Sequence, residues 1–195
     1  MKIITCKNCF KSYGKKKVIE NFTQNFSDQI YVIKGSNGSG KSTLLKILGG
    51  FESFDEGYFK SDLANILFLT NESIGENFLT IKENIELLYH LHNITIDDST
   101  WKAISNIYSD KQLDTLYEDA SLGMSLKVGC SLIISPKKWD LIILDETLSG
   151  LDEPSRNIII KYLENIVETM STTVLIVSHN YIEKSIKSDH EVINL

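Results

Sequence analysis

This sequence of 195 residues is poor in several residue types on which other protein classes depend. It has three cysteines, two prolines and one arginine, Arg156. Three cysteines cannot build the disulfide framework of a small secreted domain, and Cys6 and Cys9 lack the second C-x-x-C pair of a zinc site. We expect Cys6 and Cys9 to be two thiols in an edge strand, with metal or redox use of the pair as the alternative. A single arginine also excludes a site built from several bidentate arginine clamps.

Long apolar runs and an excess of basic charge are missing as well. No segment approaches the roughly 20 apolar residues that cross a bilayer, and the amino-terminal segment has no apolar core of a secretory signal. We therefore expect a cytosolic protein. The net charge of −6 gives no global basic field for nucleic acid or anionic membranes, so no nucleic-acid partner is expected. Lysine and main-chain amides must bind any phosphate at a local site.

The apolar pattern that is present predicts a single α/β domain over residues 1–195. Buried-strand patterns alternate with helical ones, which is typical of a sheet with a parallel core; the strand patterns cover residues 30–33, 66–69, 141–144 and 174–177. The first thirty residues indicate antiparallel strands. Residues 72–127 indicate a helical subdomain inserted into a core of residues 1–70 and 128–195. A capping box at Thr80 and a proline at Pro154 mark the starts of two helices.

The segment after residues 30–33 is the strongest motif of the sequence. It matches G-x-x-x-x-G-K-[ST] in full at residues 35–42, between a strand and a helical pattern. Such a loop aims main-chain N–H groups and a helix amino terminus at phosphate, with Lys41 reaching the β and γ phosphates and Ser42 reaching Mg²⁺. A glycine-rich turn with a chance lysine is the alternative. The residues expected to bind a nucleoside triphosphate are Gly35, Ser36, Asn37, Gly38, Ser39, Gly40, Lys41, Ser42 and Thr43.

Two adjacent carboxylates end another predicted strand. Asp145 and Glu146 follow residues 141–144, which places them at the carboxyl edge of the sheet, where α/β proteins bind ligands. We expect Asp145 to hold Mg²⁺ and Glu146 to polarise or deprotonate an attacking water. Two solvated acids are the alternative. Beside a phosphate loop, the pair favours hydrolysis of the nucleotide.

The order of these motifs resembles a known family. The acidic pair is followed by T-L-S-G-L-D at residues 147–152, and a later strand ends in V-S-H at residues 177–179. Together with the phosphate loop, this set resembles the ATP-binding cassette (ABC) ATPases, the nucleotide-binding subunits of ABC transporters, over nearly the whole chain. The resemblance implies an α/β P-loop NTPase fold with a parallel-cored sheet, N-terminal antiparallel strands and an inserted helical subdomain.

The resemblance also implies roles for individual residues. Asp152 belongs to the D-loop, which in the family lies across a dimer interface, and His179 corresponds to the switch histidine that holds the γ phosphate and the attacking water. Tyr13 corresponds to the aromatic residue that stacks on adenine. Ser121 and Gly123 keep the serine and the second glycine of the signature L-S-G-G-Q, which would place Ser121 at the amino terminus of a helix. The family arrangement implies a dimer with ATP between the phosphate loop of one chain and the signature of the other.

Several positions depart from the family pattern. Asn71 stands where a glutamine usually ligates Mg²⁺ and senses the transport partner, and its amide oxygen sits on a shorter stem. Thr147 replaces the usual proline after the acidic pair. The signature differs as well, at Ala120, Leu122 and Met124, with Lys127 where a basic residue often follows. These departures bear on the rate of turnover and leave nucleotide binding intact.

The function implied by the resemblance is that of an ATPase subunit. It would bind ATP and Mg²⁺, dimerise with an identical or related subunit, and drive a separate permease at the inner face of the cell membrane, through the helical region after Asn71. Similarity to compact bacterial exporter subunits suggests export. One alternative is a soluble ATP-driven switch acting on a protein or nucleic-acid complex, and another is a binding module that does not hydrolyse ATP. Small-molecule kinases fit less well because they need no D-loop or switch histidine.

Overall fold

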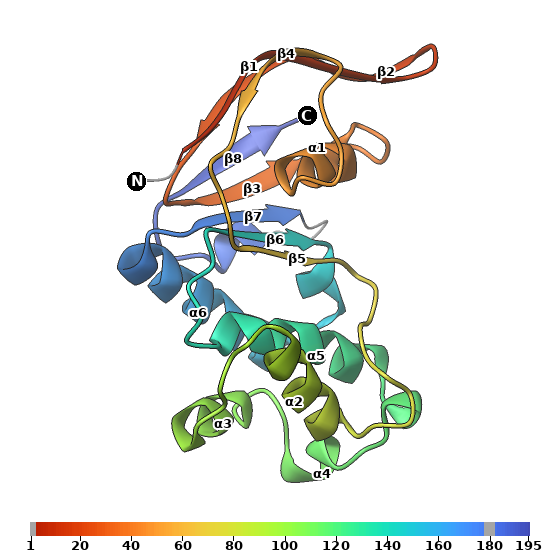
Figure 1. The fold of residues 1–195 in the computed structure, drawn as a ribbon, viewed down its shortest axis with the longest axis vertical. Coiled ribbons are helices and arrows are strands. Elements are labelled where there is room, and N and C mark those ends of the chain that lie inside the picture. Colours follow the sequence, from red (N-terminus) through yellow and green to blue (C-terminus); the bar gives the residue numbers. More distant parts are fainter. Residues whose placement is uncertain (1–2, 178–181) are drawn as a thin grey trace. The chain divides into compact units, whose positions relative to one another are not determined.

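The structure is a computed structural model that describes residues 3–177 and 182–195 (Figure 1). The chain divides into two compact units. The first, which we call the core unit, contains Met1–Phe68, Lys138–Asp145 and Glu164–Leu195. The second, the helical unit, contains Leu69–Lys137 and Glu146–Leu163. Each unit is described by itself.

A parallel sheet forms the base of the fold, as the apolar pattern predicts. Its strand order is β5-β6-β7-β3-β8, and the pairs β6–β7, β7–β3 and β3–β8 are parallel. β3, β6 and β7 are buried along almost their whole length, which explains why their sequences are continuous apolar runs. The strands are β3 (Ile30–Lys34), β5 (Ile66–Leu69), β6 (Leu141–Asp145), β7 (Thr173–Val177) and β8 (His190–Asn194).

The amino-terminal strands form an antiparallel sheet of order β2-β1-β4, which confirms the prediction of antiparallel strands in the first thirty residues. Its strands are β1 (Ile4–Tyr13), β2 (Lys16–Phe26) and β4 (Glu56–Lys60). The expected edge position of Cys6 and Cys9 is wrong, because β4 returns from far along the chain and makes β1 the middle strand. Both cysteines are fully buried, and burial raises the pKa of the Cys6 thiol to about 12. They are inert packing residues.

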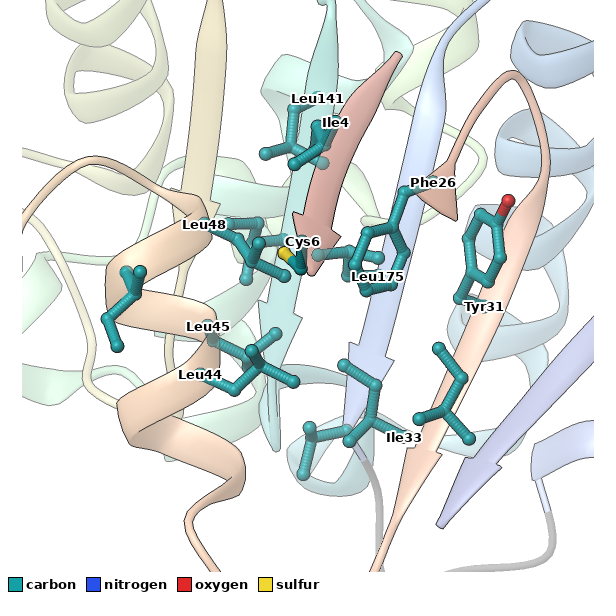
Figure 2. Close-up of a cluster of buried hydrophobic side chains, with 14 of the residues drawn as sticks. Ile4, Cys6, Phe26, Tyr31, Ile33, Leu44, Leu45, Leu48, Leu141 and Leu175 are labelled. Atoms are coloured by element: carbon teal, nitrogen blue, oxygen red, sulfur yellow. The ribbon is translucent and has the colours of Figure 1, made fainter. Parts of the chain in front are cut away.

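One apolar cluster holds the core unit together (Figure 2). Ile4, Cys6 and Phe26 come from the antiparallel sheet, and Leu141 and Leu175 come from the parallel sheet. Helix α1 (Lys41–Leu48) contributes four fully or almost fully buried aliphatic side chains to the same cluster, Leu44, Leu45, Ile47 and Leu48. Burial of this face of α1 therefore fixes the helix, and with it the loop that precedes the helix, against both sheets.

The helical unit is built around α5 (Leu122–Ile134), with α2 (Ile81–Leu91), α3 (Asp98–Ile104) and α4 (Asp110–Leu113) on the same unit. Thr80 and Glu83 form the predicted capping box at the start of α2. The Tyr89 hydroxyl of α2 donates a hydrogen bond of 2.7 Å to the Ser131 carbonyl of α5. The helical unit also contains the short 3-10 helices η1 (Tyr117–Asp119) and η2 (Thr147–Gly150). A third, η3 (Ile182–Lys184), lies in the core unit.

The long helix α6 (Glu153–Met170) begins where its sequence signals place it. Asp152 precedes the helix and accepts a hydrogen bond of 2.9 Å from the Ser155 main-chain N–H. Pro154 lies in the first turn, where a main-chain N–H has no partner within the helix, so the missing N–H of proline costs no hydrogen bond. Within residues 3–177 and 182–195, none of the helices combines the length and apolar character of a membrane span.

Gly57 in β4 tests how tightly the antiparallel sheet is built. Its φ is +103°, and a Cβ atom there would lie 2.6 Å from the Cα of Cys9, where the register of β1 and β4 shifts. Gly57→Ala should therefore lower the free energy of unfolding by roughly 3 kcal/mol, from left-handed strain plus overpacking. Gly50→Ala is the matched control, since Gly50 has a φ of +81° and no atom within 4 Å of the new Cβ, so it should cost only about 1 kcal/mol. Urea unfolding measures both, and equal losses would contradict the argument.

Candidate active site

The phosphate loop connects β3 to α1 in the core unit. Gly40 is the N-cap of α1, with φ +102°, and a Cβ atom there would lie 2.7 Å from the Val18 carbonyl oxygen. Only glycine fits this position, because both the backbone conformation and the close strand exclude a side chain. No side chain caps α1, so the N–H groups of its first turn are open to an anion.

Lys41 carries the positive charge of the loop. Its side chain is only 9% exposed, and its ammonium donates hydrogen bonds of 2.8 and 2.9 Å to the carbonyl oxygens of Gly35 and Ser36. Both acceptors are neutral, so these bonds hold the ammonium in place without cancelling its charge. The loop therefore combines a fixed cation with open main-chain donors, which is the arrangement that binds phosphate.

Asp145 ends β6 at the carboxyl edge of the parallel sheet, in the same unit as the loop. Strand register aligns it with the start of the loop, since Asp145 pairs with Val177 and Val177 pairs with Ile33, two residues before Gly35. Two strand spacings correspond to about 10 Å across the sheet. The Asp145 Oδ1 atom is buried without a hydrogen-bond partner among the described residues. A buried carboxylate oxygen without a donor is suited to a metal ion.

Glu146 begins the return of the chain into the helical unit. Its φ is +61°, a left-handed conformation that is uncommon for a residue with a side chain and is found at functional sites. The Ser149 hydroxyl donates a hydrogen bond of 3.3 Å to Glu146 Oε2, and the Ser149 N–H donates one of 3.1 Å to the Glu146 carbonyl. The carboxylate thus accepts a hydrogen bond from Ser149 in η2.

Asn71 also lies in the helical unit, two residues after the end of β5. Its side chain is exposed, and its neighbours form a small turn in which the Glu72 N–H donates a hydrogen bond of 3.1 Å to the Thr70 hydroxyl. The turn fixes the backbone on either side of Asn71 and leaves the amide group open to a ligand.

Tyr13 lies beside the phosphate-loop helix in the core unit. Its ring is 48% exposed, and its hydroxyl donates to Glu52 and lies within hydrogen-bond reach of Thr43. The hydrogen bond to Glu52 is the main cause that raises the pKa of the Tyr13 phenol. The Lys11 ammonium lies 5.5 Å from the centre of the ring, and the exposed part of the ring can stack on a base.

The signature residues start α5 in the helical unit. Ser121 is the N-cap of the helix and accepts a hydrogen bond of 3.3 Å from the Met124 N–H, which confirms the predicted helix start at this serine. Gly123 lies one residue into the helix, where an added Cβ would stand 3.1 Å from the Gly150 carbonyl oxygen. The first turn of α5 therefore passes close to the 147–150 segment.

An ion pair between a buried lysine and a half-exposed aspartate joins α5 to the segment that precedes α6. The Lys127 ammonium lies 2.6 Å from Asp152 Oδ2 and 5.5 Å from the centre of the Tyr108 ring, and the lysine side chain is 5% exposed. Burial by itself would raise the pKa of Asp152, but hydrogen bonds from Lys127 and Ser155 outweigh burial and lower it to about 2. The pair fixes Asp152 relative to the signature helix.

The predicted residues thus fall into two groups. The core unit brings together Tyr13, the phosphate loop and Asp145, and the helical unit holds the remainder, Asn71, Ser121, Gly123, Glu146 and Asp152. His179 lies outside the described residues. Two contacts were not predicted from the sequence. They are the hydrogen bond between Tyr13 and Glu52 and the ion pair between Lys127 and Asp152. The second left a signal, because a lysine inside the apolar stretch of α5 requires an anion within reach of its ammonium.

A strand, phosphate loop and helix, with an unpartnered carboxylate at the same sheet edge, define a P-loop protein of the α/β class. Comparison with family models identifies the family, because the model of the ABC transporter family matches residues 21–149. The chain belongs to the ABC transporter family and is one of its ATPase domains.

Several curated proteins and solved structures resemble the chain. It is 28% identical to the Fe(3+) ions import ATP-binding protein FbpC of Fusobacterium nucleatum subsp. nucleatum, over 95% of the chain and 54% of that protein. It is 31% identical to the lantibiotic transport ATP-binding protein SrtF of Streptococcus pyogenes, over 91% of the chain and 80% of that protein. The chain therefore spans about half the length of FbpC and most of SrtF.

The chain also resembles a ribosome protection protein and a solved ATP-binding cassette. The ribosome protection protein VmlR of Bacillus subtilis is 30% identical over 96% of the chain, which spans 34% of that protein. The solved dimeric structure of a post-hydrolysis state of the ATP-binding cassette MJ0796, bound to ADP and Pi, has a TM-score of 0.74 at 21% identity and covers 98% of the chain and 94% of its own. This structural likeness confirms the fold.

The Lys127–Asp152 pair makes the helical unit sensitive to acid. Asp152→Asn leaves a buried ammonium without its anion, so we expect a loss of about 2 kcal/mol, between the values for exposed and buried pairs. Because the folded-state pKa of Asp152 is depressed, the stabilisation is fully present above about pH 4 and is lost as pH falls toward 2.

Thermal unfolding of the nucleotide-free protein between pH 2.5 and 7 measures this effect. The difference in Tm between wild type and Asp152→Asn should shrink toward the acid end. Asp62→Asn is the control, because its pair with Lys60 is exposed on both sides and should change stability little at any pH. A pH-independent difference for Asp152→Asn would show that the ion pair is not its source.

Proposed function

We propose that the chain is the ATP-binding and ATP-hydrolysing subunit of an ABC transporter, which dimerises around Mg-ATP and drives a separate membrane permease. The observation that carries this proposal is the juxtaposition, in one unit, of a phosphate loop with a fixed Lys41 and the unpartnered Asp145 carboxylate. These groups meet the two needs of a bound triphosphate, since cationic donors neutralise the phosphates and an oxygen ligand holds a divalent cation.

Nucleotide binding follows from the loop and Tyr13. The main-chain N–H groups of residues 35–43 and the Lys41 ammonium bind the phosphates, with the ammonium exchanging its loop carbonyls for phosphate oxygens. Tyr13 stacks on the base through the exposed part of its ring. The exchange is favourable because a bond from an ammonium to an anionic oxygen is stronger than one to a neutral carbonyl.

Hydrolysis uses the acidic groups. Ser42, Asp145 and Asn71 offer the hydroxyl, carboxylate and amide oxygens that would hold Mg²⁺, and the unpartnered Oδ1 of Asp145 fits that ligand. When bound, Mg²⁺ neutralises charge that develops on the phosphates. Glu146 orients and deprotonates the attacking water, and His179 completes the site at the γ phosphate.

Dimerisation brings in the signature. We assign Ser121 and Gly123 to the γ phosphate held by a second, identical or related subunit, where the N–H groups of the first turn of α5 act as donors. Asp152 lies at the same interface. Its ion pair with Lys127 supports this assignment, because it fixes the signature helix and the 147–152 segment as one body.

The permease contact is assigned to the segment after Asn71, which would place the protein at the inner face of the membrane. Asn84 is 1% exposed and binds this segment through four hydrogen bonds, to the Glu76 N–H and to the carbonyl oxygens of Glu76, Leu79 and Thr80. The segment presents Phe78, which is 74% exposed. An exposed aromatic side chain on a fixed loop is typical of a contact with a partner. Export remains the direction implied by the family resemblance.

A second candidate function, a soluble ATP-driven switch, is favoured by one observation, the similarity to the ribosome protection protein VmlR. Affinity purification from detergent-solubilised cells separates the two functions. Recovery of a membrane protein with several spans supports transport, and recovery of ribosomes without such a protein supports the switch.

Phe78→Ala should reduce recovery of the permease about tenfold. Leu91→Ala, at a similarly exposed residue at the end of α2, should leave it unchanged, and equal recovery with both variants would remove Phe78 from the contact.

The catalytic assignment is tested by Glu146→Gln. The amide keeps the shape of the side chain but cannot accept a proton, so ATP hydrolysis should fall about 100-fold or more while ATP binding persists. The variant should also accumulate as an ATP-bound dimer in size-exclusion chromatography. Glu153→Gln, at an exposed glutamate in the first turn of α6, is the matched control. Hydrolysis unaffected by Glu146→Gln would refute the assignment, and a wild type that binds ATP but releases no phosphate would favour the binding module.

A further inference from the structure

Thr147 is the residue after Glu146, and its hydroxyl contacts a segment that is distant in the sequence. The side chain is 1% exposed, and its Oγ1 lies 3.0 Å from the Leu69 carbonyl oxygen and 3.1 Å from the Thr70 carbonyl oxygen. Its single proton is shared between these two acceptors, which come 78 and 77 residues earlier in the chain. All three residues belong to the helical unit.

The contact is more than local satisfaction of a buried hydroxyl. Thr115, Ser131 and Ser135 donate to carbonyl oxygens three or four residues earlier, which is the usual local solution for such groups. Thr147 instead reaches a segment that is distant in the sequence. Its bond therefore constrains the position of that segment relative to η2.

The two ends of this contact carry two residues of the proposed site. On one side, Thr147 holds the Thr70 carbonyl and the Thr70 hydroxyl holds the Glu72 N–H at 3.1 Å, so Asn71 lies within a fixed turn. On the other side, Glu146 precedes Thr147 directly and has a φ of +61°. Such a conformation costs about 1 kcal/mol or more and persists only where surrounding contacts hold it.

We propose that Thr147 is a positioning residue that fixes the Asn71 turn to the backbone of Glu146. The inference rests on the proposed function, since it assigns Asn71 and Glu146 to the same reaction. The shorter stem of asparagine makes this placement important, because an amide with less reach depends more on where its backbone lies. A proline at position 147 would have no hydroxyl to form this contact.

Thr147→Val and Thr147→Ser separate the hydroxyl from the shape of the side chain. Valine keeps the shape without a donor, and serine keeps the donor. In nucleotide-free protein, loss of one hydrogen bond should speed amide hydrogen exchange in residues 69–75 about fivefold in the valine variant and leave it near wild type in the serine variant. This measurement requires no hydrolysis.

In the ATPase assay, Thr147→Val should lower kcat about tenfold, as loss of a positioning partner usually does, with KM for ATP within twofold. The Mg²⁺ concentration for half-maximal activity should rise, and Thr147→Ser should restore both values. Thr172→Val is the matched control, because Thr172 is fully buried and donates to the Trp139 carbonyl at 2.6 Å, at the amino end of β7. It should lower Tm to a similar extent without lowering kcat.

Three outcomes would overturn the proposal: unchanged exchange in Thr147→Val, equal impairment of the valine and serine variants, or a kcat loss that Thr172→Val shares. A wild type without ATPase activity would instead refute the proposed hydrolysis, and the exchange experiment would still decide whether Thr147 fixes the Asn71 turn. The two failures are therefore distinguishable.

Discussion

The register of three buried parallel strands is the constraint on which the candidate site depends. β3, β7 and β6 pair so that Ile33, Val177 and Asp145 lie in one row at the carboxyl edge of the sheet. A slip of one residue would move each apolar side chain to the opposite face, where it would no longer fit the close-packed side chains around it, so packing on both faces holds the register. The row places the start of the phosphate loop and the Asp145 carboxylate at the same edge, and α1 is fixed there by its apolar face.

Charge at this edge is arranged without many charged residues. The chain has one arginine and a net charge of −6. The cationic part of the loop consists of one buried lysine, Lys41, which is held by neutral carbonyls, and of main-chain N–H groups. In the helical unit, a second buried lysine is balanced by Asp152 at 2.6 Å. The two lysines differ in one respect that matters for function, because the bonds of Lys41 leave its charge available to a ligand, whereas Lys127 is neutralised by its partner.

Much of the fold was predictable because its signals are local. The continuous apolar runs marked β3, β5, β6 and β7, and the capping box at Thr80 marked the start of α2. The helix start at Ser121 followed from the family resemblance. The middle position of β1 was not predictable, since it depends on β4, which pairs with β1 only after the chain has passed through α1. Cys6 and Cys9 were misplaced for that reason.

The sequence by itself determined the phosphate loop, the acidic pair and the order of the family motifs, because each depends on residue types at short, fixed spacing. Tertiary structure alone decided which groups are left without partners and which are held. It left the Asp145 Oδ1 open, paired Lys127 with Asp152 and joined Thr147 to the carbonyls of Leu69 and Thr70. Such contacts link residues tens of positions apart, and their geometry depends on packing of the whole unit, which residue spacing does not encode.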